Sequence, residues 1–189
     1  AHALRGRHDA VMVGIGTASA DDPDLTCRIP GFKPVPMVRV VADSHLRLRL
    51  LSRLVVTARD TPTWVLTRAD ADARRAAALE DLGVALLRVP AGGAGVDLAA
   101  GLAALAGRGI TRLLVEGGAQ LAAALLRDDL VDRIAWFHAP AVIGADGFPA
   151  AQAFGVAALD AMPRFVRERV TPVGEDVLTE LRRRREGEG

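Results

Sequence analysis

Short β-branched strands alternate with helical segments through the first two thirds of the chain, and this alternation is what most constrains the fold. It favours parallel strands joined by right-handed helical crossovers, because a parallel connection needs a dozen or more residues. Buried strands are predicted at 11–15, 37–42, 63–67, 84–89 and 112–115. Helices are predicted at 71–82, between an N-cap at Asp70 and Gly83, at 97–106 after a glycine-rich turn, and at 119–126.

The pattern changes in the last third of the chain. A strand is predicted at 133–138 and a loop at 144–153. An antiparallel pair is predicted at 165–170 and 177–182, turning near Gly174. No repeat or linker divides the chain, so we expect one α/β domain with a mixed, mostly parallel sheet flanked by helices and a C-terminal antiparallel hairpin.

Composition narrows the class of protein. The formal net charge of +1 gives no basic field of the kind that nucleic acid binding needs. No apolar run approaches the roughly 20 residues of a membrane span. Cys27 is the only cysteine and the four histidines lack metal-ligand spacing, so neither disulfides nor a metal centre are expected. We expect a cytoplasmic protein with no nucleic acid or membrane partner.

Glu116-Gly117-Gly118 lies between a predicted strand and a predicted helix. Free N–H groups at the start of a helix, with glycines that allow close approach, suit a pyrophosphate. The two glycines could equally serve only to make a tight turn. Glu116 favours a ligand site, because α/β sheets bind ligands at the carboxyl ends of their parallel strands.

The stretch between Gly14 and Arg28 carries the densest group of polar residues. Gly14-x-Gly16 is only part of a dinucleotide fingerprint, because Ser19 stands where the third small residue belongs. The run Asp21-Asp22-Pro23-Asp24 breaks helices, so a loop is predicted after the strand. Loops on rigid scaffolds often bind ligands. The polar side chains of this loop are Thr17, Asp21, Asp22, Thr26 and Arg28.

Taken together, these motifs resemble the reductase domain of the bifunctional riboflavin-biosynthesis deaminase–reductase family, which has a dihydrofolate-reductase-like fold. The likeness covers about residues 4 to 182. The segments that carry it are Gly14-Ile15-Gly16-Thr17, Asp21-Asp22-Pro23-x-Leu25-Thr26-x-Arg28, Val40–Asp43-Ser44, Leu114-Val115-Glu116-Gly117-Gly118, Leu130-Val131-Asp132-Arg133 and Ala139-Pro140-x-x-Ile143-Gly144.

The resemblance implies an NADPH-dependent oxidoreductase that reduces the ribosyl group of 5-amino-6-(5-phosphoribosylamino)uracil to ribityl, by hydride transfer to C1′. It also implies a homodimer. The family positions that contact the cofactor correspond to Thr17, Asp21, Ser44, Gly117, Gly118 and Ala119. Those that contact the phosphorylated ribosylaminopyrimidine substrate correspond to Arg5, Leu25, Arg28 and Glu116, with Arg5 and Arg28 expected to clamp its phosphate.

Asp21 and Glu116 are the candidate catalytic residues, and the sequence leaves open which of them assists the proton transfers. Near-normal turnover of both Asp21→Asn and Glu116→Gln would remove both from that role.

The resemblance implies a single reductase domain over residues 1–189 that begins within the family's first helix. The family's first strand, its Ser-Leu-Asp-Gly-like loop with a lysine and the deaminase half have no counterpart here. Two other functions remain open at this point. One is a reductase of the same fold acting on another pterin-like or pyrimidine substrate; a substrate without phosphate would not need the Arg5–Arg28 clamp. The other is a non-catalytic nucleotide-binding remnant.

Overall fold

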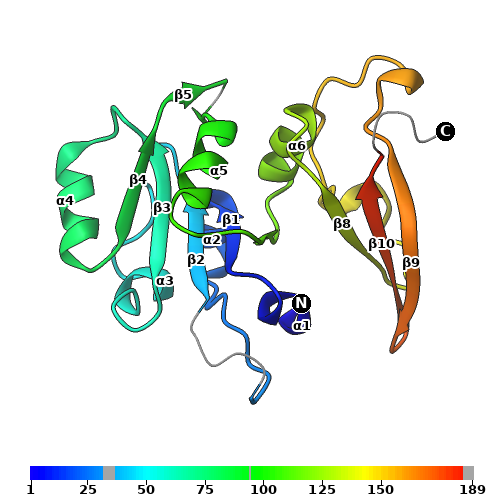
Figure 1. Cartoon of the computed structure of the whole chain (residues 1–189), viewed down its shortest axis with the longest axis horizontal. Coiled ribbons are helices and arrows are strands. Elements are labelled where there is room, and N and C mark those ends of the chain that lie inside the picture. Colours follow the sequence, from blue (N-terminus) through cyan, green and yellow to red (C-terminus); the bar gives the residue numbers. More distant parts are fainter. Residues whose placement is uncertain (32–36, 94, 185–189) are drawn as a thin grey trace. The chain divides into compact units, whose positions relative to one another are not determined.

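Five parallel strands form the largest sheet in the structure, a computed structural model that describes residues 1–31, 37–93 and 95–184. Their order is β4-β3-β2-β1-β7, of which Figure 1 labels the first four. Strands β1 and β7 are far apart in the sequence but pair directly. The five predicted strands and their parallel pairing are confirmed. The strands are β1 (Ala10–Gly14), β2 (Val38–Ala42), β3 (Thr63–Arg68), β4 (Ala85–Val89) and β7 (Leu113–Val115).

Helices and a buried loop cover this sheet. One face packs on α2, α3, α4 and the buried leucines of the loop after β2. On the other face, α5 contacts the sheet where Gly101 lies against Leu66. The elements are α1 (His2–Gly6), α2 (Ile15–Asp21), α3 (Arg53–Val56), α4 (Ala73–Asp81), α5 (Leu98–Ala106), α6 (Ala119–Arg127) and a small hairpin of β5 (Ala91–Gly92) with β6 (Gly95–Val96).

The segment after β1 is a helix, and the predicted loop is wrong there. Gly14 adopts an extended conformation as the N-cap, and α2 runs from Ile15 to Asp21 with Ala18 buried. The Asp-Pro sequence ends the helix without preventing it, since the helix stops where Asp22 turns left-handed at φ 41°. The Asp-Pro sequence therefore ends the helix at Asp22 but does not disturb the residues before it.

The N-cap of α4 also differs from the prediction. Asp72, not Asp70, accepts the capping hydrogen bond, from the N–H of Arg75 at 2.7 Å. The carboxylate of Asp70 instead pairs with Arg68, with Nε–Oδ1 at 2.8 Å. The helix therefore starts at Ala73, two residues later than predicted.

The chain divides into two compact units, Ala1–Leu121 and Ala122–Gly189, with the boundary inside α6. The second unit contains a three-stranded antiparallel sheet in the order β8-β10-β9, whereas the sequence predicted one mixed sheet. Its strand at 133–138 and its antiparallel pair turning at Gly174 are confirmed. The elements are β8 (Arg133–His138), η1 (Gly144–Asp146), η2 (Leu159–Ala161), β9 (Phe165–Val173) and β10 (Asp176–Arg183).

Arg39 is a charged residue in the middle of the first unit's core, with only 2% of its surface exposed. Its Nη2 donates to the carbonyls of Leu54, Thr57 and Thr61, at 3.3, 3.2 and 2.6 Å, and its Nη1 to the Thr57 hydroxyl at 2.9 Å. Burial lowers the pKa of Arg39 to about 10, which still leaves the guanidinium charged at neutral pH. Arg39 therefore ties β2 to α3 and to the loop that leads into β3.

Replacing Arg39 by methionine keeps much of its volume but leaves the carbonyls of Leu54, Thr57 and Thr61 without their donor. We expect the free energy of unfolding to fall by about 3 kcal/mol, since each unpaired buried acceptor costs about 1–3 kcal/mol and some relax toward water. Denaturant unfolding followed by circular dichroism measures this change. Arg74→Met, at an exposed site on α4, is the control; equal stabilities of the two variants would contradict the assigned role.

Candidate active site

Three neighbouring strands end at one edge of the parallel sheet, and each is followed by predicted site residues. Because β2, β1 and β7 pair in parallel, their carboxyl ends lie side by side. Ser44 follows β2, Thr17 lies in the first turn after β1, and Glu116 follows β7. The sheet therefore gathers the predicted cofactor and substrate residues along a single edge.

Gly117 and Gly118 form an unusual turn at the end of β7. Their φ angles are +76° and +90°, a region that side chains rarely adopt. A Cβ on either glycine would lie 3.5 Å from the side chain of Thr17. Within the described residues, no acceptor pairs with the N–H groups of Gly117, Gly118 or Ala119. The turn thus offers free donors beside a hydroxyl, which is the chemistry that a pyrophosphate needs.

Thr17 and Asp21 lie four residues apart on α2, so they share one face of that helix. Thr17 is half-buried against the glycine turn, whereas Asp21 is exposed at the last helical residue. The helix that the sequence missed is therefore what orients these two residues relative to each other.

Ser44 is held between two strand ends and the β5–β6 hairpin. Its carbonyl accepts from the Thr67 hydroxyl at 3.3 Å and from the N–H of Arg68 at 3.4 Å. Its hydroxyl lies 2.8 Å from where a Cβ on Gly95 would stand, so any side chain at residue 95 would require this hydroxyl to move. The buried carboxylate of Asp43 accepts from the N–H of Leu48 at 2.8 Å and closes the loop after Ser44.

The strongest polar contact at this edge is a two-point ion pair between Arg5 and Glu116. Nε and Nη2 of Arg5 donate to Oε1 and Oε2 of Glu116 at 2.8 and 2.6 Å. Their side chains are 14% and 21% exposed, so solvent screens the pair only partly. The hydrogen bonds to Glu116 outweigh desolvation and raise the pKa of Arg5. Two residues predicted to face the substrate therefore bind each other.

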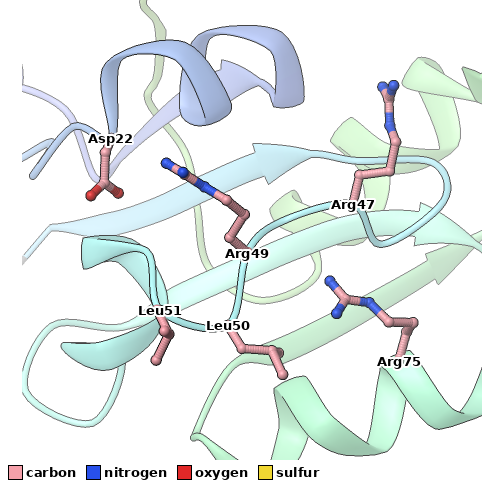
Figure 2. Close-up of a pocket in the computed structure, with 6 residues that line it drawn as sticks. All are labelled: Asp22, Arg47, Arg49, Leu50, Leu51 and Arg75. Carbon is pink, nitrogen blue, oxygen red and sulfur yellow. The ribbon is translucent and has the colours of Figure 1, made fainter.

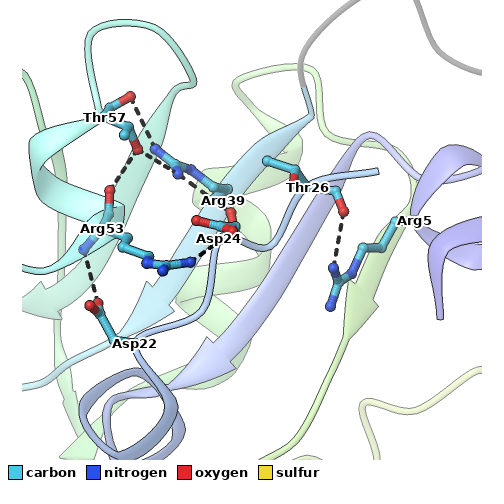
Figure 3. A network of polar contacts seen from close by, with 7 residues as sticks. All are labelled: Arg5, Asp22, Asp24, Thr26, Arg39, Arg53 and Thr57. Atoms are coloured by element: carbon cyan, nitrogen blue, oxygen red, sulfur yellow. Dashed lines mark hydrogen bonds and ion pairs between the residues drawn. The ribbon is translucent and has the colours of Figure 1, made fainter. Parts of the chain in front are cut away.

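Arg5 also reaches the segment that follows α2. Its Nη1 donates to the carbonyl of Thr26 at 3.0 Å (Figure 3). The next two residues bond to His2 of α1: the Cys27 thiol to its carbonyl at 3.3 Å, and the N–H of Arg28 to its Nδ1 at 3.2 Å. Residues 26–28 are thus bound to α1, and Arg28 is exposed beside it.

The acidic residues of the same segment anchor it on its other side. Asp22 accepts from the N–H of Arg53 at 2.9 Å, and Asp24 accepts from the Arg53 guanidinium at 3.0 Å (Figure 3). Leu25, directly after Asp24, is 3% exposed and belongs to the hydrophobic core. Its φ of +51° shows that the anchored ends hold the backbone in a conformation that leucine rarely adopts.

The two-arginine clamp stays a prediction. Arg28 is exposed, while three of the five N–H donors of Arg5 already bond to Glu116 and Thr26. Within the described part of the chain, the other two donors of Arg5 have no partner and could serve a ligand. Leu25 offers no exposed side chain to a substrate.

Sequence reasoning missed the arginines that position the site residues. Arg39, Arg53 and Arg75 each hold a loop through its carbonyls or carboxylates. A usable signal existed only for Arg39, as a lone charge among the β-branched residues of β2. Across the described ranges, no group of three His, Cys, Asp or Glu residues is arranged to hold a metal ion.

Comparison with known proteins identifies the family. Residues 1–179 match the family described as the RibD C-terminal domain. The chain belongs to this family. It is 30% identical over 178 residues to the riboflavin biosynthesis protein RibD of Bacillus amyloliquefaciens, covering 94% of this chain but 47% of that protein. The chain therefore spans about half the length of the RibD relatives it matches.

A shorter relative matches this RibD C-terminal domain over more of its own length. The 2,5-diamino-6-ribosylamino-4(3H)-pyrimidinone 5′-phosphate reductase of Methanothermobacter thermautotrophicus is 35% identical over 184 residues, with 95% of this chain and 82% of that protein covered. Among solved structures, a pyrimidine reductase-like protein from Corynebacterium diphtheriae is similar with a TM-score of 0.78, at 22% identity and with 98% and 79% of the two chains covered. Acinetobacter baumannii RibD gives a TM-score of 0.75, at 23% identity and with 97% and 49% covered. These structures confirm the fold.

The glycine turn allows a direct test. In Gly118→Ala the new Cβ would meet atoms only at ordinary contact distances of 3.5–3.6 Å, so the cost is one of backbone conformation. We expect the free energy of unfolding to fall by about 1–2 kcal/mol in denaturant titrations. Gly16→Ala is the matched control, because Gly16 lies in α2 with open space around its Cβ position. A loss of stability in Gly16→Ala and none in Gly118→Ala would contradict this view of the turn.

Proposed function

We propose that this chain is an NADPH-dependent reductase of riboflavin biosynthesis, which converts the ribosyl group of 5-amino-6-(5-phosphoribosylamino)uracil to ribityl. The observation that carries the proposal is the placement of Glu116, which contacts Arg5 and directly precedes the Gly117–Gly118 turn. A carboxylate for the substrate and free N–H donors for the cofactor therefore adjoin each other at the carboxyl edge of the sheet.

The residues at this edge fit a dinucleotide. Gly117 and Gly118 leave the space that side chains would fill, and their N–H groups and the Thr17 hydroxyl are suited to the pyrophosphate. Ser44, at the adjacent strand end, would contact the adenosine side, and Asp21 the nicotinamide side. When bound, the dihydronicotinamide supplies the hydride.

The remaining chemistry concerns the substrate and the chain's own carboxylates. The closed N-glycoside opens when a proton leaves its nitrogen and one reaches the ring oxygen, so that C1′ becomes an imine carbon. Addition of a hydride to C1′ and of a proton to the nitrogen then gives the ribitylamine. Glu116, which is paired with Arg5, would hold or accept a substrate proton, and Asp21 is the alternative. Alignment of the reacting carbons supplies most of the acceleration.

A second substrate is favoured by one comparison. The Methanothermobacter reductase, of which this chain covers 82%, is named for the 2,5-diaminopyrimidinone ribosyl phosphate. That compound differs from the uracil in carrying an amino group at C2 of the pyrimidine. If this chain prefers it, reduction precedes deamination.

We also propose that the chain forms a homodimer. Its second unit exposes large apolar side chains, which in soluble proteins often mark an interface. The most exposed are Val142, Ile143, Phe148 and Leu159. Sedimentation equilibrium should give twice the monomer mass, and a single-chain mass would refute the dimer.

In the described residues, no helix has the length and apolar character needed to cross a membrane. A cytoplasmic location stays a prediction of the sequence.

The decisive experiment follows NADPH oxidation by absorbance with either pyrimidine and with the dephosphorylated analogue of each. We expect turnover with one phosphorylated substrate and a KM at least about tenfold higher for its dephosphorylated analogue. Loss of one charged hydrogen-bonded contact weakens binding by about this factor. No turnover by folded protein that binds NADPH would refute the reductase and leave a nucleotide-binding module. Equal turnover without phosphate would favour a different substrate.

A further inference from the structure

A pocket of about 590 Å³ lies on the first unit (Figure 2). None of the residues that line it has a role in the proposed reaction. It is formed by the loop after β2, the end of α2 and the first turn of α4. The six side chains that line it are Asp22, Arg47, Arg49, Leu50, Leu51 and Arg75.

The charge of this pocket is strongly positive. Three arginines and one aspartate line it, and that carboxylate, Asp22, already accepts from the N–H of Arg53. Arg49 extends toward Asp22, whereas Arg47 points away from it (Figure 2). In the described part of the chain, neither Arg47 nor Arg49 forms an ion pair, and Arg49 makes only a 3.5 Å contact with the carbonyl of Ser19. Unpaired guanidinium groups that share a pocket repel one another, so an anion would stabilise them.

Buried leucines and hydrogen bonds to its backbone hold the loop that carries Arg47 and Arg49 in place. Leu46 and Leu48 are each 1% exposed, so the intervening Arg47 points outward. Arg75 donates to the carbonyls of Leu46 and Leu48 at 3.0 and 2.6 Å, while Asp43 accepts from the N–H of Leu48. The backbone under the two free guanidinium groups is therefore ordered before any ligand arrives, which lowers the entropic cost of binding.

We propose that this arginine pocket binds a phosphate monoester dianion, with Arg47 and Arg49 as its principal ligands. Guanidinium groups match phosphate oxygens in two-point geometry, and a dianion would balance the excess charge. The favoured source of this phosphate is the 2′-phosphate of the cofactor, and this choice rests on the proposed function. Ser44 is a predicted cofactor residue, and Arg47 follows it by three residues in the same loop. Arg68, at the neighbouring strand end, is paired with Asp70. The other source is the 5′-phosphate of the substrate.

The test is calorimetric binding of adenosine 2′-monophosphate and ribose 5-phosphate to the full chain and to Arg47→Gln/Arg49→Gln, with adenosine as the uncharged reference. We expect at least about tenfold weaker binding of one phosphate monoester and unchanged binding of adenosine. Loss for the nucleotide identifies the cofactor phosphate, and loss for ribose 5-phosphate identifies the substrate phosphate. Equal affinities of variant and wild type for both, or no binding of either by the wild type, overturn the proposal.

Two controls keep the result specific. Arg74→Gln removes an exposed arginine of α4 that does not line the pocket, and it should bind both ligands like the wild type. Arg47→Lys/Arg49→Lys keeps the charge and should recover part of the affinity, which a misfolded loop would not.

Turnover separates this proposal from the reductase activity. A wild type without turnover whose phosphate binding still depends on Arg47 and Arg49 would refute the reductase and keep the pocket. Turnover with unchanged phosphate binding and an unchanged preference for NADPH over NADH in the double variant would refute the pocket alone.

Discussion

The ion pair between Arg5 and Glu116 joins the parts of the first unit on which its site depends. It connects α1 to the end of β7, and the third bond of Arg5 holds the segment after α2 through Thr26. Because the pair is partly buried, removing either partner would leave a charge with little solvent around it. The same pair determines which donors and acceptors remain for a ligand.

A phosphate that reaches Arg5 therefore meets a guanidinium already paired with a carboxylate. Binding would use its two free N–H donors or would shift Glu116, and either route connects phosphate recognition to the position of the candidate proton carrier. Among the residues that the structure describes, none restrains the exposed side chain of Arg28 in this way. Among the described residues Arg5 is thus held by its partners and the Arg28 side chain is not, and the clamp stays a prediction.

Much of the fold was predictable because its strands are short, β-branched and separated by helical periods. The five parallel strands and the C-terminal pair follow from that pattern, and β8 has the predicted bounds. Helix α2 was missed because the Asp21–Asp24 sequence was taken to break the whole segment, whereas it acts only at Asp22. Spacing did not distinguish Asp70 from Asp72 as the N-cap, and it did not reveal that Asp70 pairs with Arg68.

The site was predictable to the extent that it follows strand ends. The contacts of Thr17 with the glycine turn follow from the pairing of β1 with β7. Contacts between elements far apart in the sequence were not predictable. The Arg5–Glu116 pair spans 111 positions, and Leu25 turns into the core because its neighbours are anchored on α3. The arginine pocket depends on a buried loop that no motif marks.

The destination of the hydride tests the central claim most directly. The protein would be given cofactor carrying deuterium at C4 of the nicotinamide, on each face in turn, and the pyrimidine product examined by NMR and mass spectrometry. One of the two labelled cofactors should yield a ribityl product with one deuterium on C1′. A product without deuterium at C1′ from both, or label on the pyrimidine ring, would contradict the account.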